Sequence, residues 1–200
     1  MAQNEKTRKL PLFRHTCKEL VVRPERKADE KRIREVIQEA FDLMPFSTGR
    51  EWELVEKVRK SPNYIPSLSL VAVCDGVIVG HSMISLVEIS GKKKKRDALV
   101  LYPVSVIPDL QRQGIGEEMI RIGIESSKRT PLPVMIVVGD PNYYSRFGFE
   151  RAVPYGIHMP FGFDEESYLQ VLELSPGALE RTEGIVTIPP SFFDEKGDLL

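Results

Sequence analysis

A strand–helix–strand unit in the middle of the chain restricts the possible folds more than any other feature of the sequence. Residues 98–107 form an apolar strand pattern, a helical pattern begins at Gly114-Ile115-Gly116, and residues 134–138 are an almost unbroken apolar run. Such a run is typical of a strand that is buried on both faces. Two strands that are joined through a helix lie parallel in one sheet. We therefore expect residues 98–107 and 134–138 to be parallel neighbours.

The residues before this unit predict antiparallel strands. Residues 68–74 and 77–89 are β-rich runs separated by Asp75-Gly76, a pair that favours a tight hairpin turn. A lysine-rich turn at residues 91–97 then leads into the strand of the crossover unit. Residues 19–23 predict a short first strand. After the crossover, strand patterns recur at 168–174 and 184–188.

Periodic apolar residues predict the helices. Asp29 can cap a first helix that ends before Pro45, and its apolar face is expected to be Ile33, Val36, Ile37, Ala40 and Phe41. A second helix at residues 51–60 carries Trp52, Val55 and Val58 on one side. The helix after the glycines is expected to bury Ile115, Met119, Ile122 and Gly123. A short helix is expected at residues 142–146.

Composition excludes several classes of protein. Twenty-eight basic and 29 acidic residues leave a formal net charge of -1, which provides no field that would attract nucleic acid or a membrane surface. No run of residues approaches the ~20 apolar residues of a membrane span, and residues 1–14 lack the apolar core of a signal peptide. Cys17 and Cys74 are far apart in sequence and have no CxxC partner, so neither a disulfide nor a zinc site is expected. We expect a cytoplasmic protein in a reducing compartment.

The segment with the clearest chemistry is the loop Gln111-Arg112-Gln113-Gly114-Ile115-Gly116, which lies between a strand and a helix. Free N–H groups at a helix start attract anions, and glycines let a phosphate approach the main chain. No Lys-Ser or Lys-Thr follows, as a P-loop would need, and the third glycine of a dinucleotide fingerprint is missing. A pyrophosphate is the natural ligand. The alternative is a glycine-rich helix start that serves packing alone.

This loop resembles the Q/R-x-x-G-x-G/A motif of the GNAT (GCN5-related) N-acetyltransferase superfamily, which holds the pyrophosphate of CoA. Tyr143-Tyr144-Ser145-Arg146-Phe147-Gly148-Phe149 resembles the Y-x-x-x-G-F element of the same superfamily. The stretch from Gly139-Asp140-Pro141 onward, Gly80-His81 and the ending Ile188-Pro189-Pro190-Ser191-Phe192 are similar to a subgroup of small bacterial predicted acetyltransferases. An asparagine that many members carry before the tyrosine falls here at Val137, so no asparagine contact is expected.

The resemblance implies an α+β GNAT fold. Its sheet is mixed and mostly antiparallel, with a splayed parallel pair of central strands and helices on both faces. A bulge near Ser105 would help to open the pair. Residues 1–18 are expected to be a polar lead-in, residues 19–160 the N-acetyltransferase domain, and residues 161–200 strands that complete the same domain.

The resemblance also implies a site for acetyl-CoA as co-substrate, without a metal ion. The residues expected to bind it are Val104, Ser105, Val106, Gln111, Arg112, Gln113, Gly114, Ile115, Gly116 and Glu117. Tyr144 is implied as the general acid for the leaving thiolate, and Tyr143 as a packing residue, with the roles exchanged as the alternative. The general base is left open between Glu88, His81, Asp140 and water.

The function implied is transfer of an acetyl group to a primary amine by direct attack on the thioester. A small-molecule acceptor is favoured, because the C-terminal strands are expected to close the acceptor cleft. The alternatives are a protein N-terminus or lysine as acceptor, and a non-catalytic acyl-CoA sensor. Lys92–Arg96 is expected to be a solvated turn, and Met159, Phe161 and Phe163 either line an acceptor pocket or pack in the core. The oligomeric state is left open, a homodimer included.

Overall fold

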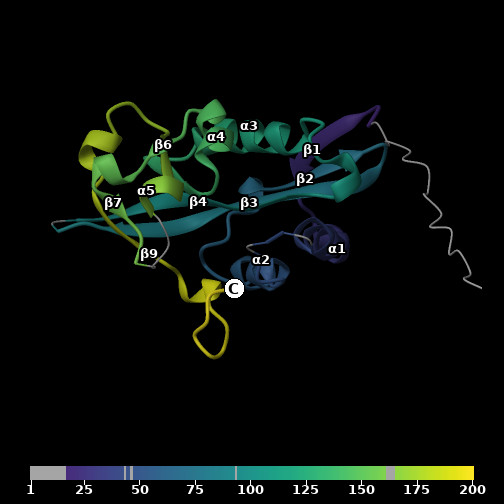
Figure 1. Cartoon of the computed structure of the whole chain (residues 1–200), viewed down its shortest axis with the longest axis horizontal. Helices are drawn as coiled ribbons and strands as arrows, with labels where there is room; N and C mark the ends of the chain where they lie inside the picture. Colours follow the sequence, from purple (N-terminus) through teal and green to yellow (C-terminus); the bar gives the residue numbers. More distant parts are fainter. Residues whose placement is uncertain (1–16, 43, 46, 93, 161–164) are drawn as a thin grey trace, which may run out of the picture.

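The computed structural model describes residues 17–200 except 43, 46, 93 and 161–164. These residues form one mixed sheet of nine strands in the order β1-β2-β3-β4-β5-β8-β6, with β9 paired to β3 and to β7 (Figure 1). The strands are β1 (Leu20–Pro24), β2 (Ser69–Cys74), β3 (Val77–Ser90), β4 (Lys95–Val106), β5 (Val134–Val138), β6 (Glu150–Arg151), β7 (Ile157–His158), β8 (Leu169–Glu173) and β9 (Gly184–Thr187).

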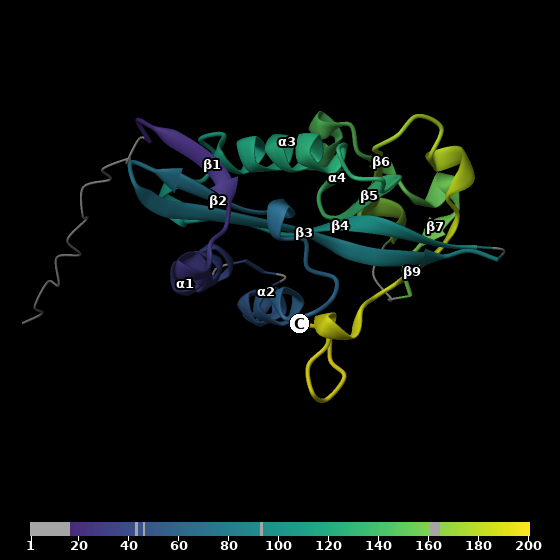
Figure 2. The ribbon, with the colours of Figure 1, turned by 180° about the vertical axis from the view of Figure 1, so that it is seen from behind.

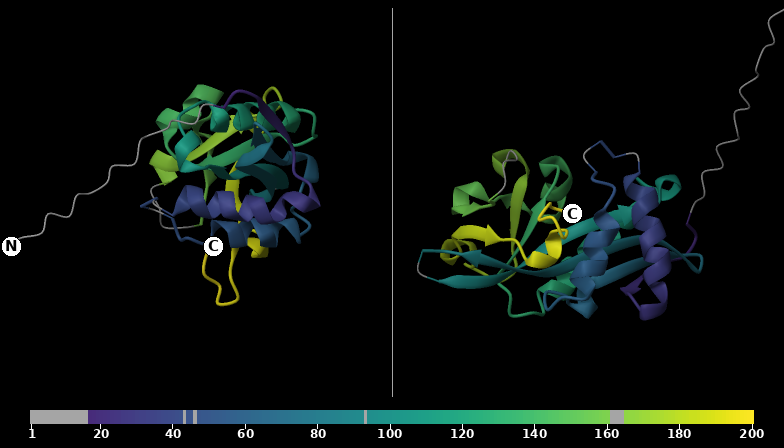
Figure 3. Two further views of the ribbon diagram at one scale, coloured as in Figure 1. Left: turned by 90° about the vertical axis from the view of Figure 1, so that its right-hand side faces the viewer. Right: turned by 90° about the horizontal axis from the view of Figure 1, so that it is seen from below.

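Helices cover both faces of this sheet, as Figures 1 and 2 show. The helices are α1 (Glu30–Phe41), α2 (Glu51–Arg59), α3 (Ile115–Ser127), α4 (Pro141–Tyr144) and α5 (Glu165–Tyr168). Helices α1 and α2 lie side by side on one face, with the C-terminus close to α2 (Figure 3). Helices α3 and α4 lie on the opposite face. No helix in the described part of the chain has the length and apolar character that crossing a membrane requires. The predicted α+β fold is confirmed.

The predicted hairpin is confirmed. Strands β2 and β3 pair antiparallel on either side of Asp75-Gly76, and both turn residues have positive φ angles, 49° and 84°. Left-handed conformations at both positions are what a tight hairpin turn requires, and aspartate and glycine tolerate them. The register shifts between Ala72 and Val73, which marks a bulge in β2.

The buried face of α3 differs in part from the prediction. Ile115, Met119 and Gly123 are buried as expected, but Ile122 is only half-buried. Ile120 and Ile124 are buried instead, at 1% and 6% exposure. The buried stripe therefore includes the position after Met119. Gly123 allows close packing, since a Cβ there would lie 2.8 Å from Cδ1 of Ile84 on β3.

The parallel pair β4–β5 is splayed, as predicted. The two strands pair only at Leu99 with Met135 and at Val100 with Ile136. Beyond Val100, no strand in the described part of the chain pairs with this side of β4. The prediction of a bulge near Ser105 was wrong in position. The register between β3 and β4 shifts where Tyr102 and Pro103 lie opposite the single residue Met83, two residues after the last β4–β5 pair at Val100.

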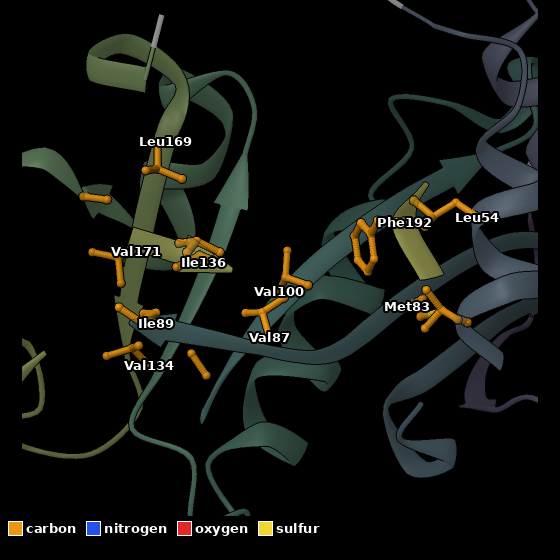
Figure 4. Close-up of a cluster of buried hydrophobic side chains, with 14 of the residues drawn as sticks. Leu54, Met83, Val87, Ile89, Val100, Val134, Ile136, Leu169, Val171 and Phe192 are labelled. Atoms are coloured by element: carbon orange, nitrogen blue, oxygen red, sulfur yellow. The ribbon is translucent and has the colours of Figure 1, made fainter. Parts of the chain in front are cut away.

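The largest apolar cluster lies between the sheet and the α1–α2 layer. Figure 4 shows it extending from Leu169 and Val171 on β8 to Leu54 on α2. The C-terminal residues join this cluster, because Phe192 and Leu200 are buried in it. The segment is also tied to α2 by polar contacts. The Arg50 guanidinium donates to the Asp194 carboxylate at 2.7 Å, and Lys57 Nζ donates to the Phe193 carbonyl at 2.7 Å.

The prediction for the two cysteines was wrong. Cys17 and Cys74 form a disulfide across a sequence separation of 57 residues, with their Cα atoms 5.6 Å apart. The pairing follows from strand topology, since β1 pairs antiparallel with β2 and brings Leu20 opposite Cys74. Sequence spacing alone contained no trace of this proximity, because β1 and β2 are separated by two helices.

Candidate functional site

The splay opens at the end of β4 that leads into α3. Strand β4 ends at Val106, and a 3₁₀ turn (Pro108–Leu110) and the glycine loop follow before α3 begins at Ile115. Parallel strands end at the same edge of a sheet, so the carboxyl ends of β4 and β5 both lie near the start of α3. The two strands diverge at this edge. An unpaired strand edge and a helix N-terminus therefore adjoin one another. Both present main-chain groups to a ligand.

The glycine loop has the backbone conformation that an anion site requires. Gly114 is the N-cap residue of α3 with φ 86°, and Arg112 also has a positive φ of 61°. No side chain among the described residues caps this helix start, and its first backbone bond joins the Glu118 N–H to the Gly114 carbonyl. The N–H groups of Ile115, Gly116 and Glu117 precede that bond, so they are available to an anion and are assisted by the helix dipole.

Several expected binding residues use their side chains for structure. Gln111 Nε2 donates to the Val106 carbonyl at 3.0 Å, and Gln113 Nε2 donates to the Asp109 carbonyl at 3.3 Å. Ser105 is buried, and its hydroxyl donates to the His81 carbonyl at 3.1 Å. These bonds fix the loop on the sheet, so a ligand at this place would meet main-chain atoms. The side chains of Val104, Val106 and Ile115 pack in an apolar cluster beneath the loop.

Two charged residues of the loop differ in their surroundings. Arg112 is exposed. The Glu117 carboxylate instead accepts from the Arg121 guanidinium at 2.7 Å and lies 3.7 Å from Arg146. Arg121 holds the pKa of Glu117 below its ordinary value, with Arg146 adding to the effect. Glu117 thus balances the charges of two nearby arginines.

Tyr144 lies at the end of α4 against the carboxyl end of β5. Its ring covers Gly139 so closely that a Cβ there would overlap it, and it makes edge contacts with Tyr143 and Phe149 at centroid distances of 5.0 and 5.8 Å. Burial raises the pKa of the Tyr144 phenol, and the neighbouring Tyr143 adds to the rise. The phenol therefore keeps its proton at neutral pH, as a proton donor must.

Tyr143 is directed toward the start of α3. Its hydroxyl oxygen lies 3.3 Å from the position that a Cβ would occupy at Gly116, and the Arg146 guanidinium stacks 4.6 Å from its ring centre. Burial raises the pKa of Tyr143 as well. The two adjacent tyrosines therefore contact different segments, Tyr143 the glycine loop and Tyr144 the end of β5.

The three candidate bases have different surroundings in the structure. Glu88 lies on the paired part of β3, and its carboxylate accepts from Lys95 Nζ at 2.9 Å and from the Ser90 hydroxyl. Lys95 lowers the pKa of Glu88, with Ser90 contributing. Asp140 is exposed and caps α4 by accepting from the Asn142 N–H at 2.9 Å. Each of these carboxylates thus has a local structural partner.

His81 is fully buried, and its Nε2 lies 3.3 Å from the Glu25 carboxylate and 3.2 Å from the Ser69 hydroxyl. Burial lowers the pKa of His81 in spite of the nearby Glu25. Burial alone would raise the pKa of Glu25, but hydrogen bonds from His81, Arg59 and Tyr64 bring it well below its ordinary range. This network lies on the face opposite α3 and has no exposed imidazole with which to receive a proton.

Tyr102 is a further residue at the splay that sequence reasoning did not identify. It is half-buried on β4 at the bulge, two residues after the last β4–β5 pair, and packs against the α1–α2 cluster. Burial raises its pKa, and the electrostatic influence of Glu51 and Tyr144 adds to this rise. Glu51, at 3% exposure, begins α2 and accepts from the Ser47 hydroxyl and the Thr48 N–H. The place of Tyr102 at the splay depends on how β5 leaves β4, which could not be read from the sequence.

The remaining candidates are the residues suggested for an acceptor pocket and the lysine-rich turn. Phe161 and Phe163 lie outside the described residues. Met159 packs partly against the main core cluster. In the lysine-rich turn, the described residues Lys92, Lys94 and Lys95 are exposed, and Lys95 pairs with Glu88.

Gly139→Ala is expected to lower kcat by about tenfold, because a small displacement of a reacting group is enough for a loss of this size. The new Cβ would overlap the Tyr144 ring and force it to shift. Gly123→Ala is the control, since its Cβ would crowd Ile84 instead. Steady-state kinetics at saturating acetyl-CoA, with thermal melts of both variants, provide the measurement. Equal kcat in the two variants would contradict a special role for the Tyr144 position.

A family model described as an acetyltransferase (GNAT) domain matches residues 21–152, which include the splay, the glycine loop and both tyrosines. The chain belongs to the GNAT acetyltransferase family. An N-acetyltransferase of Escherichia coli K12, YjhQ, is 33% identical over 141 residues, 70% of this chain and 75% of that protein. E. coli YhbS, also named an N-acetyltransferase, is 28% identical over 142 residues, 70% of this chain and 82% of that protein.

Two solved structures share this architecture. E. coli YhbS in complex with CoA has a TM-score of 0.77 at 25% identity, and the match covers 89% of this chain and 95% of that one. A GNAT acetyltransferase from Brucella melitensis in complex with acetyl-CoA has a TM-score of 0.70 at 31% identity, covering 87% of this chain and 98% of that one. The predicted GNAT family and fold are therefore confirmed.

Proposed function

We propose that this GNAT N-acetyltransferase transfers the acetyl group of acetyl-CoA to a primary amine of a small molecule. The observation that carries the proposal is the unpaired edge of β4 beyond Val100, placed between the glycine loop and Tyr144. The residues fit acetyl-CoA. An extended pantetheine arm needs free main-chain groups, and a pyrophosphate needs the uncapped N–H groups at the start of α3. The CoA and acetyl-CoA complexes of the two similar structures support this choice of co-substrate.

The proposed binding residues fall into two groups by what they offer. Val104, Ser105 and Val106 offer the main chain of β4 to the pantetheine arm. The loop from Gln111 to Glu117 offers main-chain N–H groups to the pyrophosphate, and Arg112 adds an exposed positive charge. Gly116 allows α3 to approach Tyr143 closely, because a Cβ there would lie only 3.3 Å from the Tyr143 hydroxyl oxygen.

Bound acetyl-CoA supplies the acetyl group as an activated thioester. A main-chain N–H of β4 beyond the splay stabilises the negative charge that develops on the carbonyl oxygen as the amine nitrogen forms its bond to the carbon. Tyr144 donates a proton to the thiolate as the carbon–sulfur bond breaks. The amine releases its own proton to a base. Since His81, Glu88 and Asp140 are enclosed or locally paired, we propose that water receives this proton.

A small acceptor is supported by the C-terminal part of the chain. We propose that residues 19–160 form the acetyltransferase domain and that residues 161–200 complete it, since β8 pairs with β5 and β9 pairs with β3. The 3₁₀ turn Pro190–Phe192 packs against α2 on the face opposite α3. We propose that this coverage narrows the approach to the splay, whereas an extended peptide would need a more open approach.

The purified protein is expected to release CoA from acetyl-CoA when a small primary amine is supplied. The measurement is a thiol assay over two sets of acceptors, small primary amines and peptides that offer a free N-terminus or a lysine. Turnover confined to peptides would replace the small acceptor with a protein acceptor. Tight acetyl-CoA binding with no turnover in either set would contradict catalysis and favour a sensor.

A further inference from the structure

The Cys17–Cys74 disulfide lies where chemistry in solution can reach it. Cys17 is half-buried and lies three residues before the edge strand β1, whereas Cys74 ends β2 and is 7% exposed. Cys17 is thus the more exposed of the two cysteines, while Cys74 is held in the core. These are the two cysteines of the sequence, so no third thiol in the chain competes for either sulfur.

The disulfide belongs to the apolar cluster on which the glycine loop rests. Cys74 is a member of this cluster and Cys17 packs against it. The same cluster contains Val106 at the end of β4, Leu110 before the loop, and Ile115 and Met119 in the first half of α3. Both ends of the loop are therefore anchored in the small core that the disulfide closes at the β1 edge.

A second set of contacts holds the cysteines near one another without the covalent bond. The Asp75 carboxylate accepts from the Glu19 N–H at 3.0 Å and from the Lys18 N–H at 3.4 Å, and the Asp75 N–H donates to the Glu19 carbonyl at 3.0 Å. After reduction, these bonds would keep the Cys17 backbone beside the hairpin. The two thiols would remain close enough to close again, so the bond is suited to reversible chemistry.

We propose that the Cys17–Cys74 disulfide is a reversible redox switch that sets how tightly the glycine loop binds acetyl-CoA. The identity of that ligand rests on the proposed function. Exposed disulfides are typically the labile ones, with regulatory or catalytic roles, whereas structural disulfides resist reduction. Cys17 is the more exposed cysteine, Cys74 is buried, and both contact the apolar cluster that anchors the glycine loop. This combination fits a sensing role.

The switching chemistry needs a low-molecular-weight thiol, such as glutathione, as the reductant. Its thiolate attacks Cys17 Sγ, the sulfur–sulfur bond breaks, and Cys74 leaves as a thiolate that takes up a proton. A second thiolate attacks the external sulfur of the mixed disulfide and releases Cys17. Two electrons enter the protein, two protein thiols form, and two small thiols leave as one disulfide. Oxidants reverse the step.

Oxidation is expected to favour binding. The covalent link restricts the motion of the β1 edge and of the cluster beneath the loop. Less conformational entropy is therefore left to be lost when the ligand binds. Reduction restores that freedom while the sheet and the Asp75 contacts persist. We expect the reduced protein to bind acetyl-CoA about fivefold more weakly, at the lower end of typical coupling between sites.

The test compares acetyl-CoA affinities by calorimetry for the full chain, oxidised and after reduction by a phosphine, with EDTA present throughout to exclude metal binding by the thiols. Cys17→Ser is the matched control and should show the weaker affinity in both buffers. Equal affinities of the two wild-type states would overturn the switch, as would two free thiols that no mild oxidant closes. Absence of binding in both states would refute the proposed ligand itself, and the switch with it. A wild-type difference that Cys17→Ser abolishes would establish it.

Discussion

Replacing Tyr144 with phenylalanine is expected to lower kcat by about 10²- to 10⁴-fold, the usual contribution of a general acid. Phenylalanine keeps the ring that packs on Gly139 and Phe149, so acetyl-CoA affinity and thermal stability should stay near wild type. The hydroxyl matters mainly in the transition state, so kcat and kcat/KM should fall together. Steady-state kinetics with an acceptor from the amine panel provide the measurement.

Tyr143→Phe is the internal control for this substitution. The Tyr143 hydroxyl faces Gly116 rather than the end of β5, so its loss should leave kcat nearly unchanged. Loss of turnover in Tyr143→Phe with a mild effect in Tyr144→Phe would exchange the two roles. Mild effects in both would mean that the thiolate leaves without help from a tyrosine.

The pH dependence of kcat provides a second check on Tyr144. Burial raises its pKa above the ordinary value of a tyrosine, about 10. A raised pKa keeps the phenol protonated to higher pH. The acid form is therefore fully present at neutral pH and is lost only above the ordinary tyrosine pKa. We expect no decline of kcat between about pH 7 and 10 from this group. A decline there that disappears in Tyr144→Phe would contradict the buried position.

The crossover unit shows why so much of the fold was predictable from the sequence. Residues 134–138 were predicted as a strand from their unbroken apolar character, and β5 has these bounds. The pattern is strong because both faces of that strand are buried. The hairpin at Asp75-Gly76 was equally clear, since few residues tolerate positive φ at both turn positions. Burial of both faces in the strand, and positive φ angles in the turn, each restrict the residue types at consecutive positions.

Features that depend on distant segments were not predictable in the same way. The disulfide forms because β1 lies against β2, although two helices separate them in sequence. The bulge lies at Tyr102–Pro103 rather than near Ser105, because it depends on how β4 pairs with β3 on one side while β5 leaves it on the other. For the same reason the sequence could not show that the amide side chain of Gln111 bonds the end of β4.

Gly114→Val is expected to weaken acetyl-CoA binding by about 10- to 100-fold, as the loss of one or two hydrogen bonds to a charged ligand would. No atom lies within 4 Å of the new Cβ, so the effect does not come from a clash in the free protein. It comes from φ 86° at the N-cap, a conformation that a β-branched residue avoids at a cost of about 1–3 kcal/mol. Relief of this strain would turn the N–H groups of the loop away from the pyrophosphate.

Gly197→Val is the matched control for Gly114→Val. Gly197 has the same φ of 86° and the same open surroundings, but it lies in the C-terminal turn after Asp194. Both substitutions should therefore cost similar stability, and only Gly114→Val should change the affinity measured by calorimetry with acetyl-CoA. Unchanged affinity in a folded Gly114→Val protein would remove the glycine loop from the binding site. Equal losses in the two variants would attribute the effect to general destabilisation.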